Sequence, residues 1–344
     1  MQHFTLGRTG LEISRTGFGA LPIQRVGFDE ASALLNRALD GGINYIDTAR
    51  AYTDSEEKIG RAIGHRRGEY SIATKSHAKT AEALTRDLET SLRLLDTDHI
   101  DVYQFHNPPF VPAPGGDDGL YEAALKAKAA GKIRFIGISQ HSIDRAFEAV
   151  NSGLYDVLQY PFNHLATDRE VELVALCRQK NVGFVCMKAM SGGLVTDARL
   201  PFAWLSRFDH IVPIWGVQRM RELEEILALS ENPPALDDGI LARIEEDRRE
   251  LVGAFCRSCG YCLPCPAGIP IHNANRMRQL LERSPWQSWV TPEWRAGMEK
   301  IENCIRCGAC AKRCPYGLKP YETLPAQLAF YREFVKSHGA DAAR

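Results

Sequence analysis

The chain has 344 residues, of which 44% are hydrophobic and 25% charged, and its formal net charge at pH 7 is −1. This length suggests about two domains, and the composition is that of a globular protein. The small net charge gives no field that would favour nucleic acid or an anionic membrane, and no apolar run approaches the roughly 20 residues that span a bilayer. Residues 1–10 lack the apolar core of a signal peptide. We therefore expect a cytoplasmic protein without nucleic-acid or membrane partners.

The first part of the chain alternates between strand and helix patterns. A short hairpin is predicted at residues 2–15, with its turn at Gly7 to Gly10. The predicted strands that follow are residues 16–19, 43–46, 70–74, 100–105, 133–138, 157–159, 182–187 and 211–215. The predicted helices are residues 29–40, 56–63, 80–95, 120–130, 142–150, 168–179, 198–207 and 220–229. Strands alternating with helices favour a (β/α)8 TIM barrel; a doubly wound sheet lacks its Gly-x-Gly-x-x-Gly after the first strand.

The barrel pattern ends around Asn232-Pro233-Pro234. A charged helix is predicted over residues 237–252, and a last helix over residues 321–337. We therefore divide the chain into a barrel domain, residues 1–235, and a helical domain, residues 236–344.

Eight of the ten cysteines fall in two runs after residue 255, and each run ends in Cys-Pro. The first run is Cys256, Cys259, Cys262 and Cys265; the second is Cys304, Cys307, Cys310 and Cys314. The second run has the spacing of bacterial ferredoxins, whereas the last gap of the first run is one residue shorter. A zinc ribbon also uses paired Cys-x-x-Cys units, but zinc has no use for a third cysteine in each run or for the trailing Cys-Pro. We expect two [4Fe-4S] clusters, with a single cluster as the rival.

The two runs are expected to share their clusters. In two-cluster ferredoxins the fourth cysteine of each run ligates the other cluster. Applied here, Cys314 would join the first three cysteines of the first run, and Cys265 would join the first three of the second. The shortened gap is compatible with this if the chain turns away at Pro266. The alternative is that each run ligates its own cluster. The remaining cysteines, Cys177 and Cys186, lie in apolar segments and are expected in the core.

Four polar residues, Asp47, Tyr52, Lys75 and His106, stand at or just after the carboxyl ends of predicted strands, with Tyr52 expected to begin a helix. Active sites of such barrels lie at these ends. Singly, each residue has an ordinary structural explanation. Together they make Tyr52 a candidate general acid. Its hydroxyl can give a proton to a carbonyl oxygen, and the Lys75 cation lowers the pKa of Tyr52 by favouring the phenolate. Asp47 would hold Lys75, and His106 would hydrogen-bond the same substrate oxygen.

In order and spacing these four residues resemble the Asp-Tyr-Lys-His tetrad of the aldo-keto reductase superfamily, over residues 3–230. The cysteine-rich tail resembles that of a bacterial subgroup with a ferredoxin-like extension. The resemblance implies a (β/α)8 barrel, NADP(H) or NAD(H) bound across its top, and reversible reduction of a small-molecule carbonyl or oxidation of a polyol. The nucleotide contacts that it implies are Ser139, Gln140, Gln159, Met187, Gly216, Arg219 and Arg221.

Several of these positions depart from the family pattern. Gln140 stands where an Asn is usual, and Met187 replaces an aromatic residue that stacks on the nicotinamide. Arg219 and Arg221 are the only cations close after Gly216. One of them would contact an adenosine 2′-phosphate and favour NADP(H), the alternative being that both are solvated helix residues.

Three functions follow. The first is an NAD(P)H-linked oxidoreductase whose clusters serve electron transfer, with a redox partner protein, or serve structure. Nicotinamide transfers a hydride, which carries two electrons, whereas a cubane cluster transfers one electron at a time, so the sequence does not indicate how electrons would pass between the two. The second is a redox-neutral lyase or isomerase that uses Tyr52 and His106 as acid and base. The third is an electron-transfer subunit with the barrel as scaffold.

Overall fold

The computed structural model describes residues 1–251, 256–283 and 286–338. The chain divides into two compact units. The first unit consists of Met1–Ala189 and Arg199–Leu241, and the second of Met190–Ala198 and Ala242–Arg344. The short segment 190–198 therefore belongs to the second unit, although it interrupts the first in sequence.

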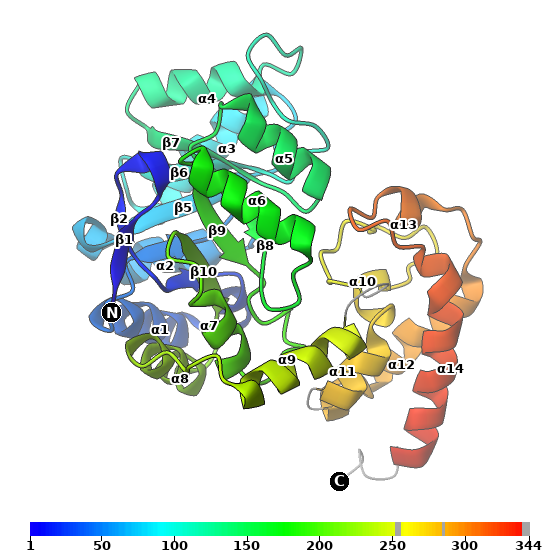
Figure 1. Ribbon diagram of the computed structural model, residues 1–344. Helices are drawn as coiled ribbons and strands as arrows, with labels where there is room; N and C mark the ends of the chain where they lie inside the picture. The colour runs from blue at the N-terminus through cyan, green and yellow to red at the C-terminus, as the bar shows by residue number, and fades with distance from the viewer. Residues whose placement is uncertain (252–255, 284–285, 339–344) are drawn as a thin grey trace. The chain divides into compact units, whose positions relative to one another are not determined.

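In the first unit, the described residues form a closed barrel of eight parallel strands (Figure 1). The order around the barrel is β10-β3-β4-β5-β6-β7-β8-β9. The strands are β3 (Gly17–Gly19), β4 (Tyr45–Asp47), β5 (Ser71–Ser76), β6 (Ile100–His106), β7 (Ile133–Ser139), β8 (Val157–Pro161), β9 (Gly183–Met187) and β10 (Ile211–Gly216). Each overlaps a predicted strand by at least half of that strand's length, so the expected (β/α)8 barrel is confirmed.

Helices connect successive strands and cover the outside of the barrel (Figure 1). They are α1 (Phe28–Asp40), α2 (Ser55–Ile63), α3 (Ala81–Leu95), α4 (Leu120–Ala129), α5 (Ile143–Ser152), α6 (Asp168–Gln179), α7 (Arg199–Leu205) and α8 (Met220–Glu231). Their apolar faces are buried, as amphipathic periodicity predicts. The barrel interior is filled by side chains such as Tyr45, Val102, Val157 and Val212, so it is a packed core.

The predicted hairpin precedes the barrel. Strand β1 (His3–Thr5) pairs antiparallel with β2 (Glu12–Ser14). Gly7, with a φ of +50°, lies between them, and a Cβ on it would stand 2.3 Å from the backbone nitrogen of Gly183 at the start of β9. Only glycine allows this approach. Leu6 and Leu11 thereby join the barrel core.

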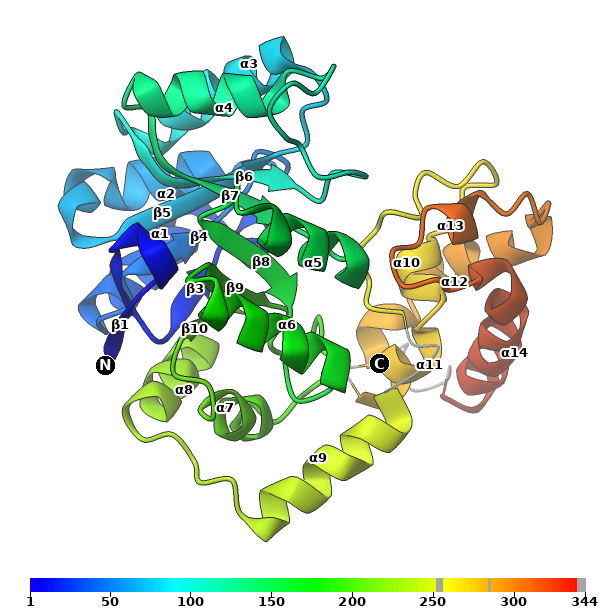
Figure 2. The same cartoon turned by 45° about the horizontal axis from the view of Figure 1, so that its top comes forward.

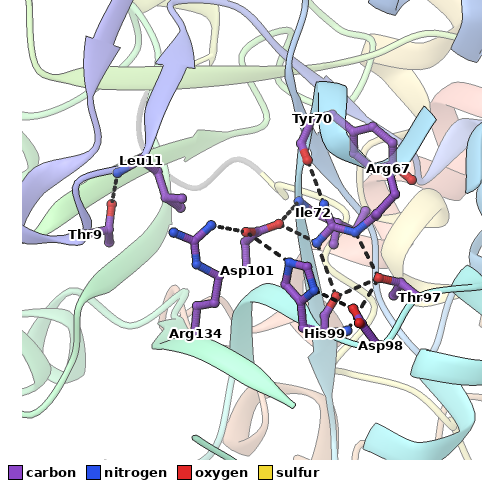
Figure 3. Close-up of polar contacts among 10 residues, drawn as sticks. All are labelled: Thr9, Leu11, Arg67, Tyr70, Ile72, Thr97, Asp98, His99, Asp101 and Arg134. Atoms are coloured by element: carbon purple, nitrogen blue, oxygen red, sulfur yellow. Dashed lines mark hydrogen bonds and ion pairs between the residues drawn. The ribbon is translucent and has the colours of Figure 1, made fainter. Parts of the chain in front are cut away.

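A charged network fastens the amino-terminal ends of three strands (Figure 3). Asp101, 2% exposed at the start of β6, accepts a hydrogen bond from the backbone nitrogen of Ile72 in β5 at 2.9 Å. The same carboxylate forms ion pairs with Arg67 at 2.7 Å and with Arg134 of β7 at 2.8 Å. This end of a barrel carries stability rather than chemistry.

The second unit is helical where it is described. Its helices are α9 (Asp238–Leu251), which begins in the first unit, α10 (Ile271–Ala274), α11 (Met277–Arg283), α12 (Pro292–Glu299), α13 (Ala309–Lys312) and α14 (Pro320–His338). The long α14 lies beside α10, α11 and α12 (Figures 1 and 2). The predicted charged and final helices are α9 and α14, except that residue 252 lies outside the described residues. No helix in the described ranges has the length and apolarity to cross a membrane.

Segment 190–198 is fixed to the second unit by two arginines. Arg276 donates to the carbonyl oxygen of Gly192 at 2.9 Å, and Arg283 donates to that of Leu194 at 3.4 Å. Arg283 is itself held by Asp247 of α9 at 2.9 Å. These contacts give a physical reason for its grouping with the second unit.

Candidate active site and cysteine cavities

A buried ion pair lies at the carboxyl ends of β4 and β5. Lys75 Nζ is 2.7 Å from Asp47 Oδ1 and donates to the carbonyl oxygen of Thr48 at 2.6 Å. Lys75 is 1% exposed and Asp47 2%. Burial lowers the pKa of Lys75 and raises that of Asp47, and their mutual attraction opposes both shifts. Because the Lys75 ammonium makes two short hydrogen bonds, to Asp47 and to the Thr48 carbonyl, the geometry favours the ionised form of both side chains.

Tyr52 and His106 lie next to this pair. Lys75 Nζ is 5.4 Å from the centroid of the Tyr52 ring, and the Tyr52 and His106 rings meet edge to face with centroids 6.0 Å apart. The prediction that Tyr52 begins a helix is wrong. It lies in a turn before α2, and the φ of +38° at Thr53 cannot continue a right-handed helix into Ser55. The four predicted residues are thus brought together at one end of the barrel.

His106 is a neutral group in this setting. Burial lowers its pKa well below the ordinary value, and His77, Lys75 and His141 add to the shift. The imidazole of His77 stacks on that of His106 with centroids 3.8 Å apart and an interplanar angle of 11°. The sequence analysis did not single out His77, and the available signal was its position directly after β5, at the same end of the barrel as His106.

Two polar networks around the site were also missed. Gln104 lies two residues before His106, on the same face of β6. Its Nε2 donates to Gln159 Oε1 at 2.9 Å and is 3.5 Å from Asp47 Oδ2, while Gln159 Nε2 is 3.3 Å from Asp47 Oδ1. A polar residue inside an otherwise apolar strand was the available signal.

The second network is built on the buried carboxylate of Glu56. It accepts hydrogen bonds from Thr74 at 2.6 Å and Ser91 at 2.7 Å, and it forms an ion pair with Arg50. The backbone of Arg50 is fixed next to Lys75, because the Arg50 backbone nitrogen donates to the Lys75 carbonyl oxygen at 2.9 Å. Arg50 is therefore a held, half-buried cation beside the candidate site.

The residues proposed for the nicotinamide end line the neighbouring strands. Ser139 ends β7 and pairs with His106 on one side and Gln159 on the other. Gln140 donates from Nε2 to the carbonyl of Pro108 at 3.0 Å, and its buried Oε1 has no partner among the described residues. A free buried acceptor fits an amide donor such as a carboxamide. Met187 ends β9 and is half-buried.

The start of α8 is occupied by its own side chain. Glu222 Oε2 accepts from the backbone nitrogens of Gln218 at 3.0 Å and Arg219 at 3.2 Å. The Arg219 guanidinium is 3.9 Å from the same carboxylate. Gly216 ends β10 and Arg221 is exposed on α8. An anion that came to these amides would compete with Glu222.

The two cysteine runs share a backbone pattern. Ser258 and Gly260 have φ values of +51° and +81°, and Arg306 and Gly308, at the equivalent positions, have +48° and +73°. Where right-handed and left-handed backbone conformations alternate along the chain, neighbouring backbone N–H groups point into one concavity, and such concavities occur at anion and iron–sulfur sites. The runs therefore fold as two copies of one turn.

The cysteines line two cavities, and each cavity takes its fourth cysteine from the other run. The first cysteine cavity is lined by Cys256, Cys259, Cys262 and Cys314. The second cysteine cavity is lined by Cys265, Cys304, Cys307 and Cys310. Arg313 ties the runs together by donating to the carbonyls of Cys262, Leu263 and Pro264 at 2.8, 3.0 and 2.8 Å. Ile271 lines both cavities.

The donor set of each cavity suits an iron–sulfur cluster. A cubane presents a separate iron to each thiolate, so its ligands surround a volume rather than a point. Four thiols around one cavity, as here, are the donor set that a [4Fe-4S] cluster requires. The other cysteines, Cys177 and Cys186, are buried, and burial raises the pKa of both thiols.

Comparison with known proteins identifies both parts of the chain. The sequence profile of the aldo/keto reductase family matches residues 15–203. The chain belongs to this family. A profile described as a 4Fe-4S dicluster domain matches residues 255–319. The predicted aldo-keto reductase with an iron–sulfur extension is confirmed.

Individual relatives agree with the family assignment. The chain is 33% identical over 219 residues to the aldo-keto reductase YhdN of Bacillus subtilis, covering 57% of this chain and 64% of that one. It thus spans just under two thirds of that relative. It is 31% identical over 215 residues to L-galactose dehydrogenase of Arabidopsis thaliana, covering 57% of this chain and 67% of the plant enzyme.

A solved structure shares the fold. The crystal structure of a Klebsiella pneumoniae aldo-keto reductase in complex with NADPH superimposes with a TM-score of 0.61 and 22% identity, covering 72% of this chain and 95% of that one. At this identity the likeness speaks for the barrel fold alone.

Proposed function

We propose that the barrel catalyses reversible, NAD(P)H-linked reduction of a small-molecule carbonyl, or oxidation of a polyol, with Tyr52 as general acid. The observation that carries this proposal is the buried Asp47–Lys75 pair with its ammonium 5.4 Å from the Tyr52 ring. When bound, the nucleotide supplies or accepts the hydride. The Tyr52 hydroxyl gives its proton to the substrate oxygen as negative charge develops there, and Lys75 stabilises the phenolate left behind. Neutral His106 hydrogen-bonds the same oxygen.

For the nucleotide, we assign Ser139, Gln140 and Gln159 to the carboxamide and Met187 to the ring. The unpartnered Oε1 of Gln140 supports this assignment. We assign the adenosine end to Gly216, Arg219 and Arg221, with NADP(H) preferred over NAD(H) once Glu222 releases Arg219.

The test is Tyr52→Phe, which removes only the hydroxyl. Carbonyl reduction should fall by at least about 100-fold, the scale of a lost general acid, with nucleotide affinity unchanged. Tyr121→Phe is the matched control, because that phenol donates to the carbonyl of Leu154 at 2.8 Å and serves packing. Near-full activity in Tyr52→Phe would remove Tyr52 from the chemistry.

For the cysteine cavities, we propose one [4Fe-4S] cluster in each, with crossed ligation. When bound, the clusters carry single electrons. The support is the lining of each cavity by three cysteines of one run and the fourth of the other. Such thiolate sites persist in a reducing compartment, so we place the protein in the cytoplasm. Anaerobic iron analysis should give about eight irons per chain; about four would leave a single cluster.

A redox partner would reach the second cysteine cavity. Cys307 is exposed there, and the neighbouring Ile305 is 70% exposed. In the second run, residues 304–314, the cations Arg306, Lys312 and Arg313 are exposed, and the run contains no acidic residue. Since this surface is basic and has an apolar point, we propose an acidic, one-electron carrier protein as the partner.

Salt tests the partner directly. Electron transfer to an acidic ferredoxin should slow as ionic strength rises, and Arg306→Glu should slow it at low salt, while the distant Arg243→Glu on α9 should not. A rate that is insensitive to salt and to Arg306 would refute an electrostatic docking at this face.

Glu222 favours one second candidate. Because its carboxylate takes the amides at the start of α8, nucleotide binding is in competition with it, and a redox-neutral elimination or isomerisation by Tyr52 and His106 needs no nucleotide. Titration with NADPH separates the two. Absence of binding would favour the redox-neutral reaction, and binding that bleaches the visible cluster absorption would favour a coupled oxidoreductase.

A further inference from the structure

A buried arginine outside the cysteine runs has few hydrogen-bond partners in the described part of the chain. Arg276 lies between α10 and α11 and is 4% exposed. Its Nη2 donates to the carbonyl oxygen of Gly192 at 2.9 Å. Its Nε and Nη1 are buried and find no acceptor among the residues that the structure describes. Burying a cation with two unpaired nitrogens is unfavourable unless an anionic group meets it.

The surroundings of Arg276 point to the first cysteine cavity. Ile271 and His272 of the preceding helix line that cavity, and the Cys256 sulfur is 3.5 Å from the carbonyl oxygen of His272. Arg276 follows one turn later, its backbone nitrogen donating to the carbonyl of Asn273 at 3.0 Å. Arg276 thus lies one turn after His272, whose carbonyl oxygen contacts the Cys256 sulfur.

Charge agrees with this placement. Burial lowers the pKa of Arg276 to about 10, and the thiolate of Cys256 opposes that shift. The two groups are thus electrostatic neighbours. A lone thiolate offers one acceptor, whereas the arginine has two free nitrogens.

We propose that Arg276 donates its Nε–H and Nη1–H to sulfur atoms of the iron–sulfur cluster in the first cysteine cavity, and is the residue that sets that cluster's potential above the other's. Gly192 holds the guanidinium through Nη2, and Nε and Nη1 are the donors that remain available to the cluster. Hydrogen bonds to cluster sulfurs and a nearby positive charge stabilise the reduced, more negative state. The inference rests on the proposed clusters, but not on the barrel's reaction.

The second cysteine cavity provides the internal comparison. It is lined by Arg306 and Arg313, and both are exposed, so water screens their charge. A buried donor acts with less screening than an exposed one. The cluster in the first cavity is therefore expected to be the easier of the two to reduce.

An anaerobic redox titration followed by electron paramagnetic resonance tests this on the full chain. Arg276→Gln should lower the potential of one cluster by at least 59 mV, a tenfold change in a one-electron equilibrium, and leave the other unchanged. Arg276→Lys, which keeps the charge, should lower it by less. Arg278→Gln is the matched control, because Arg278 is exposed and stacks on Phe330 at 4.4 Å.

The outcomes separate this inference from the cluster proposal. Unchanged potentials in both Arg276 variants would overturn it, as would a shift confined to the cluster that survives in Cys259→Ala, which lacks a ligand of the first cavity. If Arg276→Gln fails to load iron, the potential in Arg276→Lys decides. A wild-type chain that binds no iron–sulfur cluster after reconstitution would refute the clusters themselves, and this inference with them.

Discussion

Replacing Lys75 by Met would leave a buried carboxylate without its counter-charge. In the structure the ammonium contacts Asp47 Oδ1 at 2.7 Å and the carbonyl of Thr48 at 2.6 Å. After Lys75→Met, Asp47 keeps its amide contacts to Gln159 at 3.3 Å and Gln104 at 3.5 Å but loses its cation. Breaking a buried pair from one side costs about 3–5 kcal/mol, and we expect a loss of this size in the free energy of unfolding at pH 8.

The cost should depend on pH in a defined direction. Without the lysine, burial raises the pKa of Asp47 further, so the folded state binds a proton that the unfolded chain releases above about pH 4. Stability of the variant relative to wild type therefore improves as pH falls from 8 to 5.5. The double variant Lys75→Met with Asp47→Asn, which leaves no charge, should recover much of the loss at pH 8.

Urea unfolding at both pH values, followed by circular dichroism, measures these differences. Lys128→Met is the matched control, since its ion pair with Asp156, at 3.3 Å, has a lysine that is 41% exposed. An ion pair whose cation is exposed to water in this way contributes about 0–1 kcal/mol. A loss below 1 kcal/mol for Lys75→Met, or the same loss at both pH values, would refute the buried-pair reasoning.

Four further predictions address other parts of the chain. Asp101→Asn should cost about 3–5 kcal/mol in urea unfolding, yet leave kcat/KM of the folded enzyme unchanged, because it acts at the opposite end of the barrel. The pKa of His106 in the folded protein lies well below 6.5, so between pH 7 and 5 the unfolded wild-type chain binds a proton at this residue that the folded chain does not, and the free energy of unfolding falls. His106→Gln should make this fall smaller; an unchanged pH profile would contradict the prediction. Glu222→Gln should raise NADPH affinity over NADH by about two- to fivefold in fluorescence titrations; equal effects on both nucleotides would place the phosphate elsewhere. Cys265→Ala should remove the paramagnetic signal of the second cysteine cavity and spare the first, and the reverse result would support ligation of each cluster by its own run.

The barrel could be predicted because its strands are short apolar runs between amphipathic stretches. Fully buried parallel strands leave such runs in the sequence. Parallel order then places every carboxyl end on one side, which is why Asp47, Lys75 and His106 could be grouped before their distances were known. Tyr52 was placed in a helix because propensity does not report the positive φ of Thr53.

Residues that act through tertiary contacts could not be predicted. Gln104 and Glu56 look like an isolated amide and a helix-surface acid, and only packing reveals that each is buried among partners. Segment 190–198 reads as a barrel loop, and nothing local indicates that Arg276 and Arg283 hold it in the second unit. Pairing over about 90 residues of sequence has no periodic signature.

The side chain of Ile271 forms a wall of both cysteine cavities. Tunnelling through protein weakens steeply with the thickness of the barrier, and here the barrier would include one aliphatic residue. On the proposed occupancy, an electron that enters at either cluster would pass to the other and reside mainly on the cluster in the first cysteine cavity, which is the easier of the two to reduce. The rate-limiting step of electron transfer would then be the encounter of the partner protein with the exposed Cys307. Substitutions of Ile271 would leave the steady-state rate of electron transfer unchanged as long as transfer between the clusters stays faster than that encounter.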